Sequence, residues 1–207
     1  METLLKRYPM LKNCRNEIEC AEKILIECFE SGGKLLICGN GGSAADSGHI
    51  VGELMKGFLL KRELPYEIRE NIRRFFPEDA DFLCNNLQGA LPAISLCAHD
   101  ALMTAFENDV CPEMVYAQQV LGYGKKGDVL FAITTSGDSK NVLNAAKISK
   151  ALGLRVIGLT GEKKASLDEV SDMVIHVPER ETYKVQELHL PVYHYLCARV
   201  ENKIFSK

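Results

Sequence analysis

Short apolar runs alternate with longer amphipathic stretches along most of this chain. The apolar runs have the length of buried strands and predict strands at residues 34–38, 92–97, 129–133, 155–160 and 173–177. The stretches between them predict helices at residues 14–30, around His49, at 113–120, at 140–152 and from 183 to 201. Strands that alternate with helices indicate an α/β fold with a parallel sheet covered on both faces.

A charged stretch at about residues 59–91 interrupts this alternation. It carries several cationic side chains, namely Lys61, Arg62, Arg69, Arg73 and Arg74. Such a run is more often a solvated helical face than a binding element, and we favour that interpretation. The alternative is a lid that reaches over an anionic substrate.

The composition is that of an ordinary globular protein. The 207 residues are 46% hydrophobic and 26% charged, with a formal net charge of −3. We therefore expect one domain, no nucleic-acid partner and, without an apolar stretch near the ~20 residues of a membrane span, no membrane partner. The amino terminus lacks the apolar core of a secretory signal, so we expect a cytoplasmic protein whose eight scattered cysteines are reduced.

The turn after the first predicted strand has the composition of an anion site. Small residues there leave backbone N–H groups free to face a phosphate at the start of a helix, namely Gly39, Asn40, Gly41, Gly42 and Ser43. A dinucleotide site also fits the glycine spacing, but Glu63 does not end a second hydrophobic strand as that site requires. Further along the same helix, His49 and Glu53 are four residues apart and share one face.

A second turn repeats this arrangement after the strand at 129–133. Its residues are rich in hydroxyl groups that can donate to phosphate oxygens, namely Thr134, Thr135, Ser136 and Ser139. Helix capping is the alternative, but a cap uses one such residue and here there are several. Because ligands bind outside the carboxyl ends of parallel strands, the two turns could share one phosphorylated ligand.

The last predicted helix carries polar residues in an apolar background. Gln186, Glu187, His189 and His194 are candidates for chemistry, although a histidine in a helix is usually structural. Pro191 lies among them, so this helix either begins near the proline or is kinked there.

These motifs together resemble the sugar isomerase (SIS) domain family, and within it the phosphoheptose isomerases. The resemblance rests on Cys-Gly-Asn-Gly-Gly-Ser, on His49 with Glu53, on Thr-Thr-Ser-Gly-Asp-Ser and on Gln186-Glu187 followed by His194. It implies a three-layer, flavodoxin-like α/β sandwich over residues 1–207, with the charged insertion at about 59–91. It also implies a homotetramer that interconverts a ketose phosphate and an aldose phosphate, with sedoheptulose 7-phosphate as the family substrate.

The resemblance further implies roles for individual residues. Glu53 corresponds to the catalytic base and His194 to the acid, and zinc would be held by His49, Glu53, Gln186 and His194. The implied substrate contacts are Glu53 and a set from the two turns and beyond, namely Asn40, Gly41, Gly42, Ser43, Asn108, Asp109, Thr134, Thr135, Ser136, Ser139 and Gln186. A carboxylate and an imidazole suit proton transfer through an enediol, and zinc would act as a Lewis acid.

The chain departs from the family pattern in the long charged insertion, in Lys184 where many relatives have arginine, and in Pro191. Two alternatives therefore stay open. One is an isomerase for a different phosphosugar. The other is a noncatalytic SIS protein that binds sugar phosphates or serves as a replication-initiation partner, although the relative with that role lacks the acid/base pair.

Overall fold

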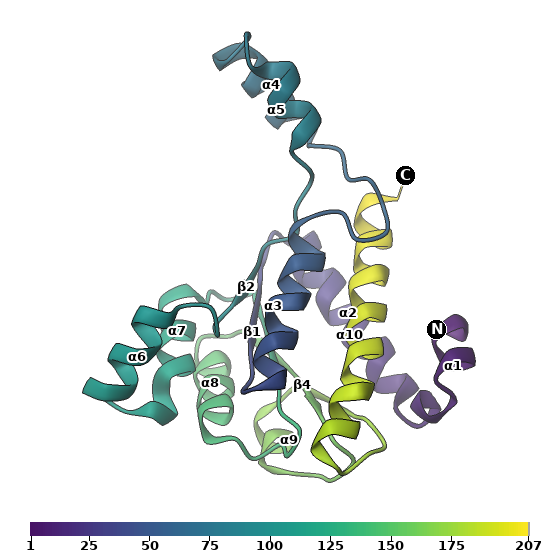
Figure 1. The fold of residues 1–207 in the computed structure, drawn as a ribbon, viewed down its shortest axis with the longest axis vertical. Helices are drawn as coiled ribbons and strands as arrows, with labels where there is room; N and C mark the ends of the chain where they lie inside the picture. The colour runs from purple at the N-terminus through teal and green to yellow at the C-terminus, as the bar shows by residue number, and fades with distance from the viewer. Residues whose placement is uncertain (207) are drawn as a thin grey trace.

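A parallel β-sheet forms the centre of the molecule. The computed structural model describes residues 1–206. Within that range the strands are β1 (Leu35–Cys38), β2 (Ala93–Ser95), β3 (Val129–Ile133), β4 (Arg155–Thr160) and β5 (Met173–His176). They pair in the order β2-β1-β3-β4-β5, and every pair is parallel (Figure 1). This is the flavodoxin-like strand order, which confirms the predicted fold class.

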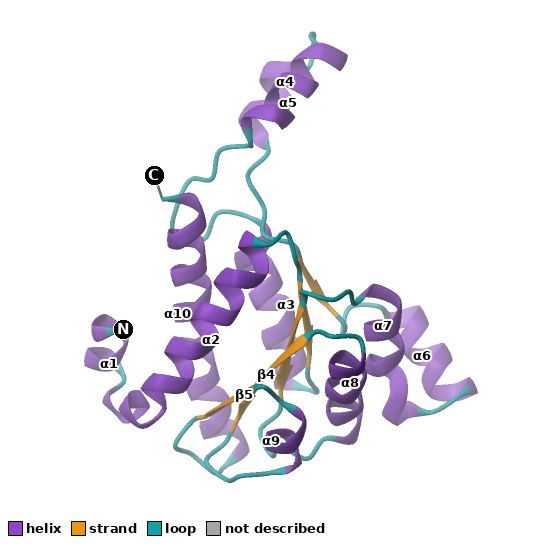
Figure 2. Ribbon diagram, turned by 180° about the vertical axis from the view of Figure 1, so that it is seen from behind, coloured by secondary structure: helices purple, strands orange, loops and turns teal. Residues whose placement is uncertain are grey.

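Helices cover both faces of this sheet. One face is covered by α2 (Arg15–Glu30), α3 (Gly42–Met55) and α10 (Thr182–Phe205). The other face carries α7 (Val115–Tyr123), α8 (Lys140–Ala151) and α9 (Ser166–Val170), with α6 (Asp100–Asp109) outside α7 (Figure 2). The chain begins with α1 (Glu2–Arg7) and a 3-10 helix (Pro9–Cys14), and a second 3-10 helix (Pro112–Met114) precedes α7.

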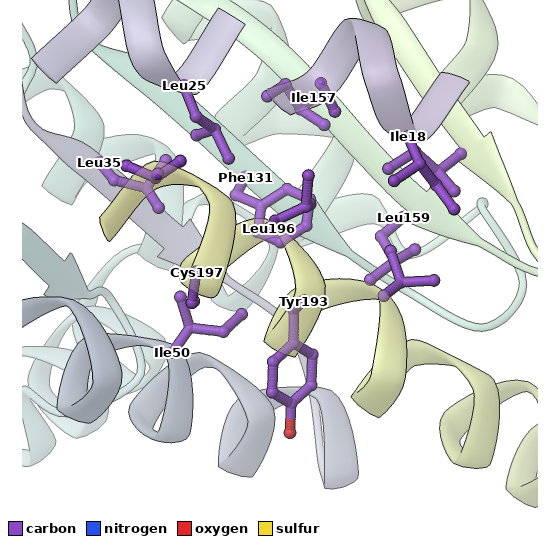
Figure 3. Packing of buried hydrophobic residues seen from close by; sticks show 14 of the residues in the cluster. Ile18, Leu25, Leu35, Ile50, Phe131, Ile157, Leu159, Tyr193, Leu196 and Cys197 are labelled. Carbon is purple, nitrogen blue, oxygen red and sulfur yellow. The ribbon is translucent and has the colours of Figure 1, made fainter. Parts of the chain in front are cut away.

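The alternation of side chains along the strands divides the core into two layers. In β3, Phe131 faces α2 and α10, whereas its neighbours Leu130 and Ala132 face α8. Figure 3 shows the first layer, where Leu196 and Cys197 of α10 meet Leu25 of α2 and Phe131 of the sheet. Because these side chains are fully buried on both faces, the strands read as continuous apolar runs in the sequence.

The charged insertion folds as a helical arm that projects from the body. Its two helices are α4 (Tyr66–Phe75) and α5 (Ala80–Asn86), which pack against each other beyond the end of α10 (Figures 1 and 2). The arm leaves the body at the carboxyl end of α3, whereas the turn at residues 39–42 lies at the amino end of that helix. The arm therefore points away from the turns of its own chain, which disfavours the lid hypothesis.

Pro191 lies inside α10, which continues from Thr182 to Phe205. The helix therefore does not begin at the proline, one of the two possibilities left open by the sequence. No helix within residues 1–206 is long and apolar enough to cross a membrane.

Candidate functional site

The two predicted phosphate turns lie side by side at the carboxyl ends of β1 and β3. These strands are neighbours in the sheet, and the chain leaves β1 toward β2 but reaches β4 from β3. The turns thus flank the switch point of the strand order, where α/β sheets bind ligands. Asn40 and Asn141 join the start of the first turn to α8, since each side-chain amide donates to the other's oxygen over 2.9 Å.

The first turn depends on two glycines for different reasons. Gly41 has φ of 55°, a left-handed conformation that glycine adopts without strain. At Gly42 a Cβ atom would lie 2.5 Å from Nε2 of Gln186. The absence of a side chain at Gly42 therefore lets the amide of Gln186, on α10, pack against the start of α3.

The second turn gathers hydroxyl groups at the amino end of α8. Thr134 Oγ1 lies 3.0 Å from Ser139 Oγ and 3.4 Å from Ser136 Oγ. Ser136 Oγ also accepts the backbone N–H of Asp138 over 3.2 Å. The helix start and its hydroxyl groups together offer several donors to an anion.

A pocket of about 350 Å³ opens between the two turns and α10. Its lining includes eight residues predicted as substrate contacts together with Thr182, which sequence reasoning missed: Asn40, Gly41, Gly42, Ser43, Thr134, Thr135, Ser139, Thr182 and Gln186. Ser136 lines an adjoining hollow of about 280 Å³ that shares Thr135 with the pocket. The structure thus brings most of the predicted phosphate-binding residues to one place.

Asn108 and Asp109 lie elsewhere, at the carboxyl end of α6. Asn108 Nδ2 donates to Asp109 Oδ1 over 2.8 Å on an exposed surface. The pocket lining, within residues 1–206, does not include either residue. Their contact with substrate stays a prediction.

The predicted acid, the predicted base and a predicted metal ligand converge between α3 and α10. His49 Nε2 lies 3.1 Å from Glu53 Oε1 and 3.3 Å from His194 Nε2. One ligand atom from each of the three residues lies within 4.8 Å of the others. A helical spacing of four residues places His49 beside Glu53, and packing of α10 against α3 supplies His194.

Tyr193 and Asp46 hold the side chain of His49 in place. The Tyr193 hydroxyl donates to Asp46 Oδ1 over 3.1 Å and lies 3.0 Å from His49 Nδ1. Figure 3 shows the Tyr193 side chain directed from α10 toward α3. Nδ1 of His49 therefore faces the Tyr193 hydroxyl, whereas Nε2 of the same ring faces Glu53 and His194.

Burial also tunes the charges of this cluster. Burial and the neighbouring His49 lower the pKa of His194, although Glu53 opposes the shift. Burial raises the pKa of Asp46, against the effects of Tyr193 and His49. The lowered pKa of His194 favours its uncharged imidazole, the form that binds metals.

The donor set fits a divalent metal ion such as zinc. Glu53 Oε2 is buried without a hydrogen-bond partner among the described residues, although Lys56 Nζ lies 3.5 Å away. Two imidazole nitrogens and a carboxylate oxygen that face one another are donors that zinc prefers. Gln186, the fourth predicted ligand, lies on α10 eight residues from His194, about 12 Å of helix rise toward the turns.

The other candidates on α10 have different surroundings. His189 is fully buried, and burial lowers its pKa to about 4. Glu187 is exposed to solvent. Lys184 Nζ forms an exposed ion pair with Glu181 at 2.6 Å. His189 therefore has the environment of a structural residue.

Sequence reasoning missed Asp46 and Tyr193. Asp46 is three residues before His49, a spacing that places both on one face of α3 and could have suggested a shared network. Tyr193 lies directly before His194, but its contact with α3 depends on how the helices pack.

Comparisons with known proteins show which family the chain belongs to. SIS domain family models match residues 4–69 and 101–198. A phosphoheptose isomerase of Crocosphaera subtropica is 38% identical over 95% of this chain and 86% of its own. One from Synechocystis is 35% identical over 92% of this chain and 84% of its own. The chain belongs to the phosphoheptose isomerase family.

The structures of family members have the same fold. A phosphoheptose isomerase from Francisella tularensis superposes with a TM-score of 0.75 at 28% identity, over 97% of this chain and 94% of that one. The resemblance inferred from the four motifs is thereby confirmed. Residues 70–100, between the two segments matched by SIS models, include most of α4 and all of α5.

Proposed function

We propose that this protein is a phosphosugar isomerase that interconverts sedoheptulose 7-phosphate and D-glycero-D-manno-heptose 7-phosphate. The observation that carries the proposal is the convergence of Glu53 and His194 with His49, in a member of the phosphoheptose isomerase family. Nearby, the two turns offer hydroxyl and backbone donors around a pocket. An isomerase needs both the cluster of Glu53, His194 and His49 and the pocket between the turns, whereas a protein that only binds sugar phosphates needs the pocket alone.

The two turns would hold the phosphate group of the substrate. Gly42 begins one helix and Ser139 precedes another, so the amino ends of two helices lie at the pocket. His49 follows Ser43 by six residues, about 9 Å of helix rise. An extended sugar phosphate would thus place its phosphate in the turns and its carbonyl end toward the cluster.

Glu53 would remove the proton beside the carbonyl, and His194 would exchange a proton with the carbonyl and hydroxyl oxygens. The Glu53 side chain is only 14% exposed, which shields the base from bulk water. A general acid or base in this position typically contributes 10²–10⁴-fold to the rate, as an order-of-magnitude estimate.

Zinc is the cofactor we propose for this site, held by His49, Glu53 and His194, with Gln186 as the fourth ligand. When bound it would supply Lewis-acid stabilisation of the negative charge that develops on the enediol. The close approach of one ligand atom each from His49, Glu53 and His194, all within 4.8 Å of one another, supports this assignment. Metal content after purification, and zinc affinity of a Gln186→Ala variant, would test it.

We also propose a homotetramer in the cytoplasm, as expected from the family resemblance. Sedimentation velocity of the purified protein tests the assembly state. Fractionation of the source cells tests the location.

The function is tested by incubating purified protein, with and without zinc, with sedoheptulose 7-phosphate and other ketose phosphates, and following the isomers by NMR. We expect turnover of the heptulose, loss of turnover in Glu53→Gln and His194→Gln, and unchanged turnover in the matched surface control Glu30→Gln. Turnover of another sugar alone would keep the reaction class but overturn the substrate. No turnover of any sugar in the panel, with phosphosugar binding retained, would favour the noncatalytic alternative.

A further inference from the structure

The helical arm, α4 and α5, exposes several large aromatic side chains to solvent. Four of its aromatic side chains are largely open to solvent: Tyr66 is 70% exposed, Phe75 63%, Phe76 57% and Phe82 70%. Within the described chain, none of the ten residues of α4 is buried. Helices of this length are marginal in water without tertiary packing, and contiguous exposed aromatic residues mark interaction surfaces.

The root of the arm, in contrast, is firmly attached to the body. Arg62 Nε donates to Glu201 Oε1 over 2.7 Å, and both side chains are buried. The segment that enters the arm is also bonded to the segment that leaves it. Gly57 N donates to Gln88 Oε1 over 2.7 Å, and Gly89 N donates to the Arg62 carbonyl oxygen over 3.2 Å. The arm is therefore a fixed projection, built to present its surface away from its own chain.

Charge along α4 is ordered in a way that complements itself. The amino half carries Glu67 and Glu70 with Arg69 between them, a net negative charge, and the last turn carries Arg73 and Arg74. When two copies of α4 lie antiparallel, the net negative half of each faces the basic last turn of the other, with Glu70 opposite Arg73, and the helix dipoles also oppose favourably. Interleaved charges of both signs fit neither a nucleic acid nor an anionic membrane, which select basic surfaces.

The same antiparallel arrangement matches the apolar residues. α4 begins at the root and ends at the tip of the arm, so its partner runs from tip to root. Ile68 of one copy then faces Phe75 of the other, and the tip residue Phe76 approaches the partner's root. Leu59 and Leu87 lie at that root and are 68% and 52% exposed. Aromatic residues surrounded by charged ones are typical of the centre and rim of a protein interface.

We propose that the α4–α5 arms of two copies of this chain pair antiparallel around a two-fold axis and form an interface between subunits. The interface is specific to the inserted segment, and it is independent of the isomerase reaction proposed above. An isologous contact of this kind joins like surfaces, so each charged pair occurs twice.

Two charge-reversal variants test the pairing directly. Glu67→Lys/Glu70→Lys makes α4 wholly basic, and Arg73→Glu/Arg74→Glu makes it strongly acidic, with Arg69 as its one remaining cation. Each variant alone should repel its own copies, whereas an equimolar mixture should pair. Lys147→Glu/Lys150→Glu, on exposed positions of α8, is the matched control with the same charge change as the acidic variant.

Sedimentation velocity over a dilution series provides the measurement, with circular dichroism to establish that each variant is folded. We expect each arm variant to dissociate at a concentration roughly tenfold or more higher than wild type. We expect the mixture to recover the wild-type assembly and the α8 control to match wild type. Equal sedimentation of all samples would overturn the interface. Weakening by both variants without recovery in the mixture would overturn the antiparallel arm-to-arm pairing.

Discussion

Replacing Arg62 by methionine is predicted to destabilise the protein by about 3–5 kcal/mol, the usual cost of removing one partner from a buried ion pair. Arg62 and Glu201 are 0% and 1% exposed in their side chains. Beyond its 2.7 Å bond to Glu201, the guanidinium donates to the carbonyl oxygens of Leu54 at 2.5 Å and Glu53 at 3.0 Å. Three charge-assisted bonds are lost together, and two of them close the carboxyl end of α3.

Glu201 is in turn the acceptor for three backbone N–H groups at the root of the arm. Phe58 N and Leu59 N donate over 2.7 Å, and Leu60 N donates over 3.2 Å. Burial alone would raise the pKa of Glu201, but these backbone bonds and Arg62 outweigh burial and lower its pKa below the ordinary value of 4.5. Its contribution to stability is therefore present above pH 4.5 and is lost as the pH falls through the lower, folded-state pKa.

Urea denaturation at a fixed protein concentration measures the effect, with Arg62→Met, Glu201→Gln and the double variant compared in a thermodynamic cycle. Because each single change leaves a buried charge unpaired, the double variant should cost less than the sum by about 1–3 kcal/mol. A cost below about 1 kcal/mol for Arg62→Met, or strict additivity, would refute this account of the pair.

Three further predictions concern the turns and α10. Gly42→Ala places a Cβ atom 2.5 Å from Gln186 Nε2 and should weaken substrate binding about tenfold, whereas the control Gly48→Ala, which meets nothing within 4 Å, should bind normally in calorimetry. Ser136→Ala should raise KM about tenfold with kcat retained, since a hydrogen bond to a phosphate is lost, and a selective fall of kcat would contradict this role. His189 has a pKa lowered from 6.5 to about 4, so the unfolded chain binds a proton at this residue more readily than the folded protein does. The free energy of unfolding, measured with urea, should therefore be about 3 kcal/mol lower at pH 4 than at pH 6.5 because of this residue. His189→Leu should remove that part of the pH dependence, and an unchanged slope would contradict it.

Much of the fold could be predicted because its signals are local. β3 and β4 have the predicted bounds, and α2 and α8 each agree to within one residue. Their strands are apolar throughout because both faces are buried, and their helices end at glycine or small polar residues. The turns at residues 39–43 and 134–139 also carry local chemistry, so the pocket between them follows once the two strands are neighbours.

The remainder depends on contacts between distant parts of the chain. The prediction of a solvated cation is wrong for Arg62, which is buried and pairs with Glu201, 139 residues away. Tyr193 contacts His49, which is 144 residues away in the sequence, and no local sequence pattern predicts such a contact. The arm helix α4 has a mixed apolar and charged surface that resembles a solvated face, because most of its apolar residues stay exposed within the chain.

The central claim is that Glu53 and His194 move a proton between the carbonyl carbon and its neighbour in a heptose phosphate. The most direct measurement is to incubate the zinc-supplied protein with sedoheptulose 7-phosphate in D₂O and follow the sugar by NMR. We predict an aldose that carries deuterium at carbon 2, ketose that gains deuterium at carbon 1, and loss of both signals in Glu53→Gln. Unlabelled, unconverted sedoheptulose 7-phosphate after incubation with the folded wild-type protein would contradict the account.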